Sequence, residues 1–291
     1  MEADLHCAED PFLQLESDYD PVVIAARRGS VNPARRLENT TETITPTEET
    51  VPHLSDPHEI VIMALGKTGD GKSSLLNDML GRQVFKHKQA VQSQTAEVQE
   101  ASGFWAPLDA HTHRVSNFGC NIRVFDTPGF GDSQLRDAQF LPTIQSKIRE
   151  LASEKNAGIH CLFLVSKVTT SVDSLLANLR TLRDLLHPSK TFWENVILVF
   201  THADASNVNR YRNNKVVLKT KVSISIKEEF GIPHELPMVF ISTQAYMCSY
   251  LKGLGECDCD RKSRYSADCR RRLYEQVWLR RSKPFHFVDT D

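Results

Sequence analysis

Gly66-Lys67-Thr68-Gly69-Asp70-Gly71-Lys72-Ser73 follows the pattern G-x-x-x-x-G-K-S, which is the spacing of a phosphate-binding P-loop. The glycines in such a loop let successive backbone N–H groups curl around a β-phosphate. Lys72 then reaches the β- and γ-phosphate oxygens, and the Ser73 hydroxyl binds Mg²⁺. We therefore expect all eight residues, together with Ser74, to contact a nucleotide.

The sequence on either side of this loop matches the context that a P-loop requires. Residues 59–65 form a short apolar run, as expected for a buried parallel strand. After the loop, Leu75, Leu76, Met79 and Leu80 recur at helical spacing, and Gly81 follows where a helix C-cap belongs. A strand, a glycine-rich loop and a helix in this order argue against a chance match.

A second motif lies about sixty residues downstream. Residues 121–125, whose apolar members Ile122, Val124 and Phe125 predict a strand, run into Asp126-Thr127-Pro128-Gly129. In P-loop GTPases, an Asp at the end of a strand holds Mg²⁺ through water, and the N–H of a following Gly contacts the γ-phosphate. The sequence therefore predicts that Asp126 and Gly129 face the phosphates.

A third motif, Thr201-His202-Ala203-Asp204, follows the apolar residues 195–200 and has the place of a guanine-reading N-K-x-D motif. Asp204 would accept hydrogen bonds from guanine N1 and N2, and the His202 ring would lie on the base plane. Taken alone, the segment could be an ordinary turn after a strand. Three motifs in the right order, each at the end of an apolar strand, favour the base-binding interpretation.

The remaining patterns predict alternating strands and helices. The class is α/β: a doubly wound, mainly parallel sheet with helices on both faces, as in the G domain of P-loop NTPases. Residues 216–230 fit either a helix or a strand by periodicity, and the fold context favours a helix. The expected elements are an antiparallel hairpin of 98–105 and 114–125, a helix around 140–151 with Pro142 in its first turn, a strand at 158–165, a helix at 172–186, a strand at 237–242 and a polar helix near 264–281.

Composition excludes several classes of protein. The formal net charge of −2 gives no global signal for nucleic-acid binding, and no apolar run is long enough to span a bilayer. The first residues lack the basic-then-apolar order of a secretory signal. Seven cysteines, an odd number at irregular positions, indicate reduced thiols rather than a disulfide framework. We expect a cytoplasmic protein, either free or peripheral on a membrane surface.

Three regions differ in composition. The composition of residues 1–57 predicts a mainly disordered acidic arm. We expect residues 58–255 to form the G domain and residues 256–291 to form a basic C-terminal helix and tail. The basic tail, which carries aromatic residues, has two interpretations: contact with an anionic membrane face or partner protein, or a solvated, salt-bridged surface helix. Four cysteines near the end fit no standard zinc spacing, so free thiols are favoured at Cys248, Cys257, Cys259 and Cys269.

The motifs together resemble the immune-associated nucleotide-binding (GIMAP-like) GTPases, whose relatives are the chloroplast outer-envelope import GTPases and the septins. The resemblance covers roughly residues 58–250. It rests on the P-loop with the Leu-Gly-x-x-x-Phe that ends at Phe85, on Ser93-Gln94-Thr95, and on the Asp126 and Thr201 motifs. The last base-contact loop, Ser242-Thr243-Gln244, is unremarkable, so the branch within the family stays open.

The resemblance implies GTP or GDP with Mg²⁺ as ligands. It makes Thr95 the expected switch-I hydroxyl on Mg²⁺, with Ser93 as the alternative, and it places Ser242 beside the base. Catalysis would fall to Lys72 and Thr95, and the family pairs G domains face to face across the nucleotide.

The sequence thus predicts a guanine-nucleotide switch that hydrolyses GTP slowly and is regulated by nucleotide-dependent homodimerisation. Phe130 occupies the position where Ras-like GTPases carry a water-orienting glutamine, and a phenyl ring cannot polarise water. Simple packing of Phe130 is the other interpretation of that residue. The alternative functions are a nucleotide-binding scaffold with negligible turnover and a P-loop ATPase.

Overall fold

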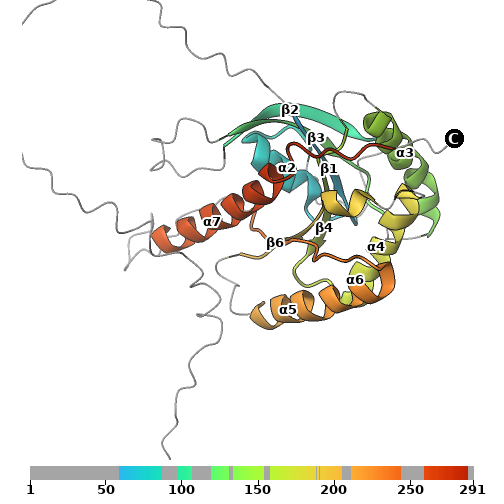
Figure 1. Ribbon diagram of the computed structural model, residues 1–291. Coiled ribbons are helices and arrows are strands. Elements are labelled where there is room, and N and C mark those ends of the chain that lie inside the picture. Colours follow the sequence, from blue (N-terminus) through green and yellow to red (C-terminus); the bar gives the residue numbers. More distant parts are fainter. Residues whose placement is uncertain are drawn as a thin grey trace, which may run out of the picture. The chain divides into compact units, whose positions relative to one another are not determined.

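The computed structural model describes residues 59–86, 97–106, 119–130, 134–153, 158–187, 189, 191–204, 211–243 and 259–287. All of these belong to one compact unit, Leu54–Asp291 (Figure 1). The predicted acidic arm at 1–57 lies outside the described residues.

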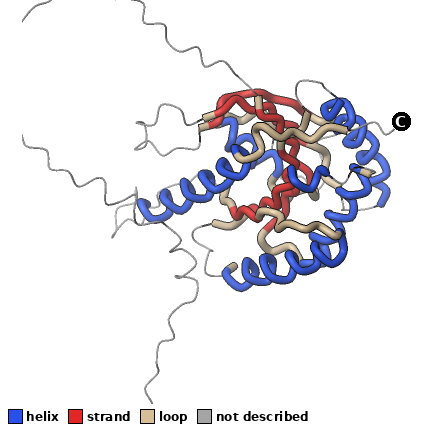
Figure 2. Tube along the Cα trace, viewed as in Figure 1, coloured by secondary structure: helices blue, strands red, loops and turns tan. Residues whose placement is uncertain are grey.

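The described residues form a six-stranded sheet in the order β2-β3-β1-β4-β5-β6, drawn in red in Figure 2. Every neighbouring pair is parallel except β2 and β3, which are antiparallel. This confirms the predicted α/β class and the antiparallel hairpin. The strands are β1 (Ile60–Leu65), β2 (Gln99–Trp105), β3 (Cys120–Asp126), β4 (Cys161–Lys167), β5 (Val196–Thr201) and β6 (Met238–Phe240).

Strand position explains the sequence patterns. The central strands β1 and β5 are buried at every residue, because helices cover both faces of the sheet there. The edge strand β2 instead mixes exposed and buried residues. Continuous apolar runs therefore mark the middle of the sheet, and the weaker pattern marks its edge.

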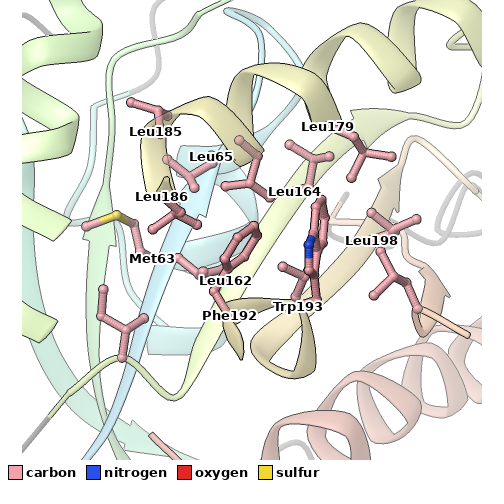
Figure 3. Close-up of a cluster of buried hydrophobic side chains, with 14 of the residues drawn as sticks. Met63, Leu65, Leu162, Leu164, Leu179, Leu185, Leu186, Phe192, Trp193 and Leu198 are labelled. Carbon is pink, nitrogen blue, oxygen red and sulfur yellow. The ribbon is translucent and has the colours of Figure 1, made fainter. Parts of the chain in front are cut away.

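Alternate residues of β1 pack into two separate cores, one on each face of the sheet. Val61, Met63 and Leu65 point into the larger core, part of which is shown in Figure 3, with side chains from α3, α4 and α6. Ile60 and Ile62 point into the other core, with side chains from α2 and α7. The helices are α2 (Lys72–Leu80), α3 (Gln134–Ser153), α4 (Val172–Leu186), α5 (Arg212–Val217), α6 (Ser223–Phe230) and α7 (Cys259–Trp278).

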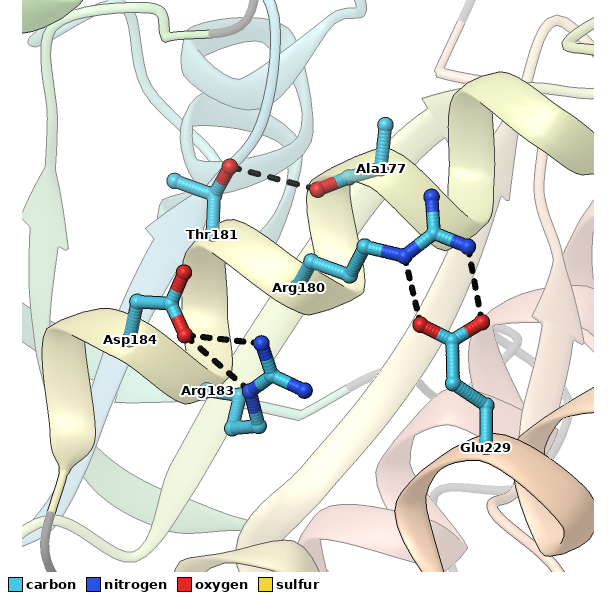
Figure 4. Close-up of polar contacts among 6 residues, drawn as sticks. All are labelled: Ala177, Arg180, Thr181, Arg183, Asp184 and Glu229. Carbon is cyan, nitrogen blue, oxygen red and sulfur yellow. Dashed lines mark hydrogen bonds and ion pairs between the residues drawn. The ribbon is translucent and has the colours of Figure 1, made fainter.

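Two short helices complete the described residues. A 3₁₀ turn, η2 (Thr191–Asn195), precedes β5, and a π-helical turn, η3 (Leu218–Val222), joins α5 to α6 without a break. The helical interpretation of residues 216–230 is therefore confirmed. On the surface, Arg180 of α4 donates to both carboxylate oxygens of Glu229 on α6, at 2.5 and 2.8 Å (Figure 4). Both side chains are open to solvent, so salt screens this pair.

The expected place of Pro142 in a first turn was wrong. The helix α3 begins at Gln134, which puts Pro142 in the middle of its twenty residues. The short, irregular pattern before Phe140 gave no sign of the earlier start. Since proline cannot donate to the carbonyl four residues before it, α3 lacks one hydrogen bond there.

Helix α7 packs against the sheet as part of the second core. Leu273 and Val277 are fully buried, and Tyr274 meets the ring of Trp105 edge-on, with ring centroids 5.2 Å apart. None of the helices in the described ranges is both long and apolar enough to cross a membrane. The domain boundaries at 57/58 and 255/256, and a membrane or protein contact of the basic tail, stay predictions.

We predict that removing one buried side chain of α7 destabilises the whole fold. Leu273→Ala leaves a cavity between α7 and the sheet and should lower the free energy of unfolding by about 2–5 kcal/mol. Leu279→Ala is the matched control, because Leu279 is 64% exposed, and its change should stay within about 0.5 kcal/mol. Chemical denaturation measures both. Equal small effects would mean that α7 contributes no core packing.

Candidate nucleotide-binding site

The P-loop connects the end of β1 to the start of α2 and has the backbone conformation that its glycines permit. Gly69 and Gly71 have φ of 81° and 90°, in the left-handed region that side chains disfavour. Lys72 Nζ donates to the carbonyls of Gly66 and Lys67, at 3.0 and 2.9 Å. The lysine is therefore folded over the loop, where its ammonium group can meet phosphate oxygens.

The metal-binding candidates from two motifs lie together. β1 and β3 pair in parallel with Ala64 opposite Asp126, so both strands end at the same height. This brings the carboxylate of Asp126 within 2.5 Å of the Ser73 hydroxyl, which donates to it. Thr127 Oγ1 donates to the Ala64 carbonyl at 2.7 Å and fixes the turn that follows β3.

The loop after Asp126 rests directly on the P-loop. A Cβ atom added to Gly129 would lie 2.2 Å from Thr68 Oγ1 and 2.3 Å from the Thr68 backbone nitrogen, so a side chain at position 129 cannot fit. The Phe130 N–H donates to the Gly66 carbonyl at 3.2 Å, and its ring is fully buried in the larger core. The packing interpretation of Phe130 is the one that the structure supports.

The third motif is also tied to the P-loop. Thr201 Oγ1 donates to the Asp70 carbonyl at 2.7 Å across 131 residues of sequence. His202 follows with φ of 58°, and its Nδ1 lies 2.9 Å from Thr201 Oγ1. Asp204 accepts a short hydrogen bond from the Ser242 hydroxyl, which orients the carboxylate. Ser242, predicted only from its position in the last base-contact loop, thus contacts the residue expected to read the base.

A cavity of about 530 Å³ lies between α2, the Thr201–Asp204 segment and α7. This volume is within the range of small-molecule binding sites. Most of the residues that line it have polar side chains, and four of them, His202, Asp204, Gly71 and Ser74, were predicted from the sequence. It is lined by Gly71, Ser74, Asn77, Asp78, Gly81, Arg82, Gln83, His202, Asp204, Thr243 and Arg270.

Not every predicted residue is placed at this site. Thr95 and Ser93 lie in 87–96, outside the described residues. Residues 131–133, directly after Phe130, also lie outside them. The Lys67 side chain turns away from the loop and donates to Ser174 on α4 at 2.9 Å. Its carbonyl, however, receives Lys72, so Lys67 acts through its backbone.

Sequence reasoning missed several residues around the cavity. Asn77 accepts from the N–H groups of Val84 and Phe85 and donates to the Phe85 carbonyl, at 2.7–2.9 Å. This one amide holds the turn that contains the Leu-Gly-x-x-x-Phe pattern, and it explains the spacing to the buried Phe85. Asp78 and Arg270 were missed because their pairing joins residues 192 positions apart.

The geometry fits a magnesium nucleotide. Backbone N–H groups of a glycine-rich turn, the N-terminus of α2 and the Lys72 ammonium all favour phosphate oxygens. The Ser73 hydroxyl and Asp126 carboxylate are oxygen donors of the kind that Mg²⁺ prefers. Within the described residues, no cluster of three or more His, Cys, Asp or Glu side chains suits another metal. Cys269 is buried in the second core, and the other three C-terminal cysteines have no described side chain.

Residues 59–220, over half of the chain, match the model of the AIG1 family. The chain belongs to the AIG1 family. It is 31% identical over 206 residues to GTP-binding protein A of Dictyostelium discoideum, covering 68% of this chain and 39% of that protein. It is also 31% identical over 154 residues to immune-associated nucleotide-binding protein 7 of Arabidopsis thaliana, covering 52% and 43%. The chain thus spans about two fifths of the length of these curated relatives.

The solved structures confirm the fold. Toc33 from Arabidopsis thaliana, in complex with GDP and Mg²⁺, superposes with a TM-score of 0.55 at 18% identity, covering 79% of this chain and 88% of that one. At this identity, the likeness establishes the G-domain fold of this AIG1-family chain. The resemblance drawn from the motifs is therefore confirmed at the level of family and fold.

We predict that His202 titrates below the ordinary histidine range. Burial lowers the pKa of its imidazole, and the nearby Lys167 ammonium lowers it further, while Asp204 opposes the shift. Because the pKa of His202 is lower in the folded than in the unfolded protein, protonation of this ring favours unfolding. Its contribution to the free energy of unfolding is fully present above about pH 6.5 and is lost as the pH falls through the pKa of the folded state.

The His202 ring proton signals, followed by NMR between pH 8 and pH 4 and assigned with His202→Gln, give the pKa directly. The difference in unfolding free energy between wild type and His202→Gln should fall as the pH is lowered from 7 toward 5. A midpoint above 6.5 would show that Asp204, rather than burial, dominates the imidazole.

Proposed function

We propose that this AIG1-family chain is a guanine-nucleotide switch that binds GTP and GDP with Mg²⁺ and hydrolyses GTP slowly. The proposal rests mainly on the 2.5 Å contact between Ser73 and Asp126, beside a P-loop whose Lys72 is poised over its carbonyls. Three separate strand ends are needed to assemble this arrangement with Asp204. The names of relatives support it, since they include a GTP-binding protein and Toc33 structures with GDP or GMPPNP and Mg²⁺.

The residues divide the work as follows. In this proposal the backbone of residues 66–74 and Lys72 bind the phosphates, and the Gly129 N–H would contact the γ-phosphoryl group. Ser73 would ligate Mg²⁺ and Asp126 would hold one of its waters, with Thr95 as the proposed switch-I ligand. Mg²⁺ would neutralise charge that develops on the phosphates. Asp204, held by Ser242, would select guanine through its N1 and N2 hydrogens.

Nucleotide competition on the purified chain tests the proposal. Wild type should prefer GTP over ATP, and EDTA should weaken triphosphate binding. Lys72→Ala serves as the reference that does not bind triphosphate. Binding that ignores EDTA and survives Lys72→Ala would refute the assignment of the phosphate site.

We predict that Asp204→Ala weakens GTP binding roughly tenfold to a hundredfold. The base edge would lose its acceptor, and leaving buried donors unpaired costs about 1–3 kcal/mol. Ser242→Ala is the milder comparison, because it keeps the carboxylate and removes only the hydroxyl that orients it. Fluorescent GDP displacement by GTP and ATP measures all three proteins. Equal affinity of wild type for ATP and GTP would show that the Thr201–Asp204 segment does not read guanine.

We also propose that turnover depends on a second protomer. Phe130 packs into the core, so this chain has no glutamine at the sequence position where Ras-like GTPases use one to orient water. Water positioning and an activating arginine together are worth about 10⁵ in rate, so a lone protomer should be slow. For the chloroplast translocon components atToc33 and psToc159, dimerization is described as important for GTPase activity.

We predict that specific activity rises with protein concentration and that a GTP analogue yields more dimer than GDP does. A neighbouring G domain would supply the groups that position water and stabilise charge. Loops that become ordered when the triphosphate is bound would hold the two domains together. Sedimentation in both nucleotide states and a series of rates against concentration measure this. Fast turnover by a monomer, flat with concentration, would reject the dimer mechanism, and no turnover at any concentration would favour a scaffold.

A further inference from the structure

Helix α7 touches the candidate nucleotide site at two points. Near its middle, Arg270 donates from Nε and Nη2 to both carboxylate oxygens of Asp78 on α2, at 2.8 and 2.6 Å. Five residues earlier, Tyr265 donates its hydroxyl to the Ala203 carbonyl at 2.8 Å. Burial raises the pKa of the Tyr265 phenol, which keeps this donor protonated. The helix therefore bridges α2 and the Thr201–Asp204 segment.

The Asp78–Arg270 pair lines the cavity described above, and the Tyr265–Ala203 contact holds α7 against the segment that carries the lining residues His202 and Asp204. Gly71 and Ser74 place the inner end of the cavity beside the P-loop, where phosphates would lie. His202 and Asp204 form the wall expected to meet the base, and Arg270 lines the same cavity from α7. The space between P-loop and Arg270 therefore corresponds to the nucleoside half of a bound nucleotide.

The chemistry of Arg270 suits that half. A guanidinium carries five N–H donors, and the pair with Asp78 uses those of Nε and one of Nη2, so the donors of Nη1 lie outside it. Asp204 offers only acceptors, which match guanine N1 and N2. Of the remaining polar atoms of a guanosine, O6 and N7 can only accept hydrogen bonds and so need a donor, and the ribose hydroxyls can accept as well as donate.

The pair with Asp78 is more than a surface ion pair. The side chains of Arg270 and Asp78 are 28% and 16% exposed, and the two parallel hydrogen bonds fix the plane of the guanidinium. A donor held in this way loses little freedom when a ligand arrives. Two other donors of the lining are engaged elsewhere: Arg82 Nη2 donates to the Ser102 carbonyl, and Asn77 Nδ2 donates to that of Phe85.

We propose that Arg270, oriented by Asp78, binds the nucleoside half of the guanine nucleotide through Nη1 and so makes α7 a wall of the binding site. The inference rests on the proposed function, because it assumes that the P-loop holds the phosphates. It assigns a nucleotide contact to a helix beyond residues 59–220, the part that matches the family model.

Calorimetric titration of the full chain with GDP and with inorganic pyrophosphate, both with Mg²⁺, tests the proposal. Arg270→Met should weaken GDP binding about tenfold and leave pyrophosphate binding unchanged, because pyrophosphate lacks the nucleoside. Arg270→Lys keeps the charge but has no Nη1 donor, so it should lose most of the same affinity. Arg271→Met is the matched control, since Arg271 pairs with the exposed Asp268 on α7 itself and does not line the cavity.

The outcomes separate the two proposals. Wild type that binds neither GDP nor pyrophosphate would overturn the proposed function itself. GDP binding of wild-type strength in both Arg270 variants would overturn only the role of Arg270. An equal loss of GDP and pyrophosphate affinity would also overturn it, because Arg270 would then act through the packing of α7 alone.

Discussion

The parallel register of β1 with its neighbours is the constraint on which the candidate site depends. β1 is hydrogen-bonded on both sides, to β3 and β4, and is buried on both faces. Sliding β3 by one residue against β1 would turn its buried side chains to the opposite face. The register that keeps both cores filled is the same one that sets Asp126 beside Ser73. Burial of apolar surface thus fixes the geometry of a polar site.

The hydrogen bond from Thr201 to the Asp70 carbonyl connects the P-loop to the Thr201–Asp204 segment, the side of the candidate site that we propose for the base. β5 does not pair with β1, because β4 lies between them. Strand pairing therefore sets the distance between the ends of β1 and β5 only indirectly, through β4. Thr201 is fully buried, and its hydroxyl closes that gap directly. Because a buried carbonyl without a donor is costly, the bond favours one relative position of P-loop and Thr201–Asp204 segment. The parts of the candidate site that we propose for the phosphates and for the base are therefore held in one fixed relative position.

The sequence predicted the parts of this site that depend on local spacing. A few consecutive residues were enough to recognise the P-loop, Asp126 at its strand end and the Thr201 motif. The apolar runs predicted the strands and most of the helices. The start of α3 was wrong because the residues before Phe140 carry no helical periodicity, and Pro142 suggested a first turn. The roles of Asn77, Asp78 and Arg270 could not be read at all. The residues next to a polar side chain on a helix do not indicate which distant residue it will contact. Arg270 lies 192 residues from Asp78 in the sequence.

Helix α7 illustrates how a mostly polar segment becomes part of a folded domain and, through it, of the site. Its sequence has few apolar residues, yet Leu273, Val277 and Tyr274 reach the second core. Most helical stability in proteins comes from such packing rather than from intrinsic propensity. The same helix also contacts Asp78 and Ala203, so any displacement of α7 would break both contacts and remove Arg270 from the cavity lining. Thermodynamic linkage is reciprocal. If bound nucleotide favours the packed position of α7, then a partner that displaces α7 must lower the affinity for nucleotide by the same factor by which nucleotide lowers the affinity for that partner. In that case, a partner that binds the basic residues of α7 and displaces the helix would also change the affinity of the site for nucleotide.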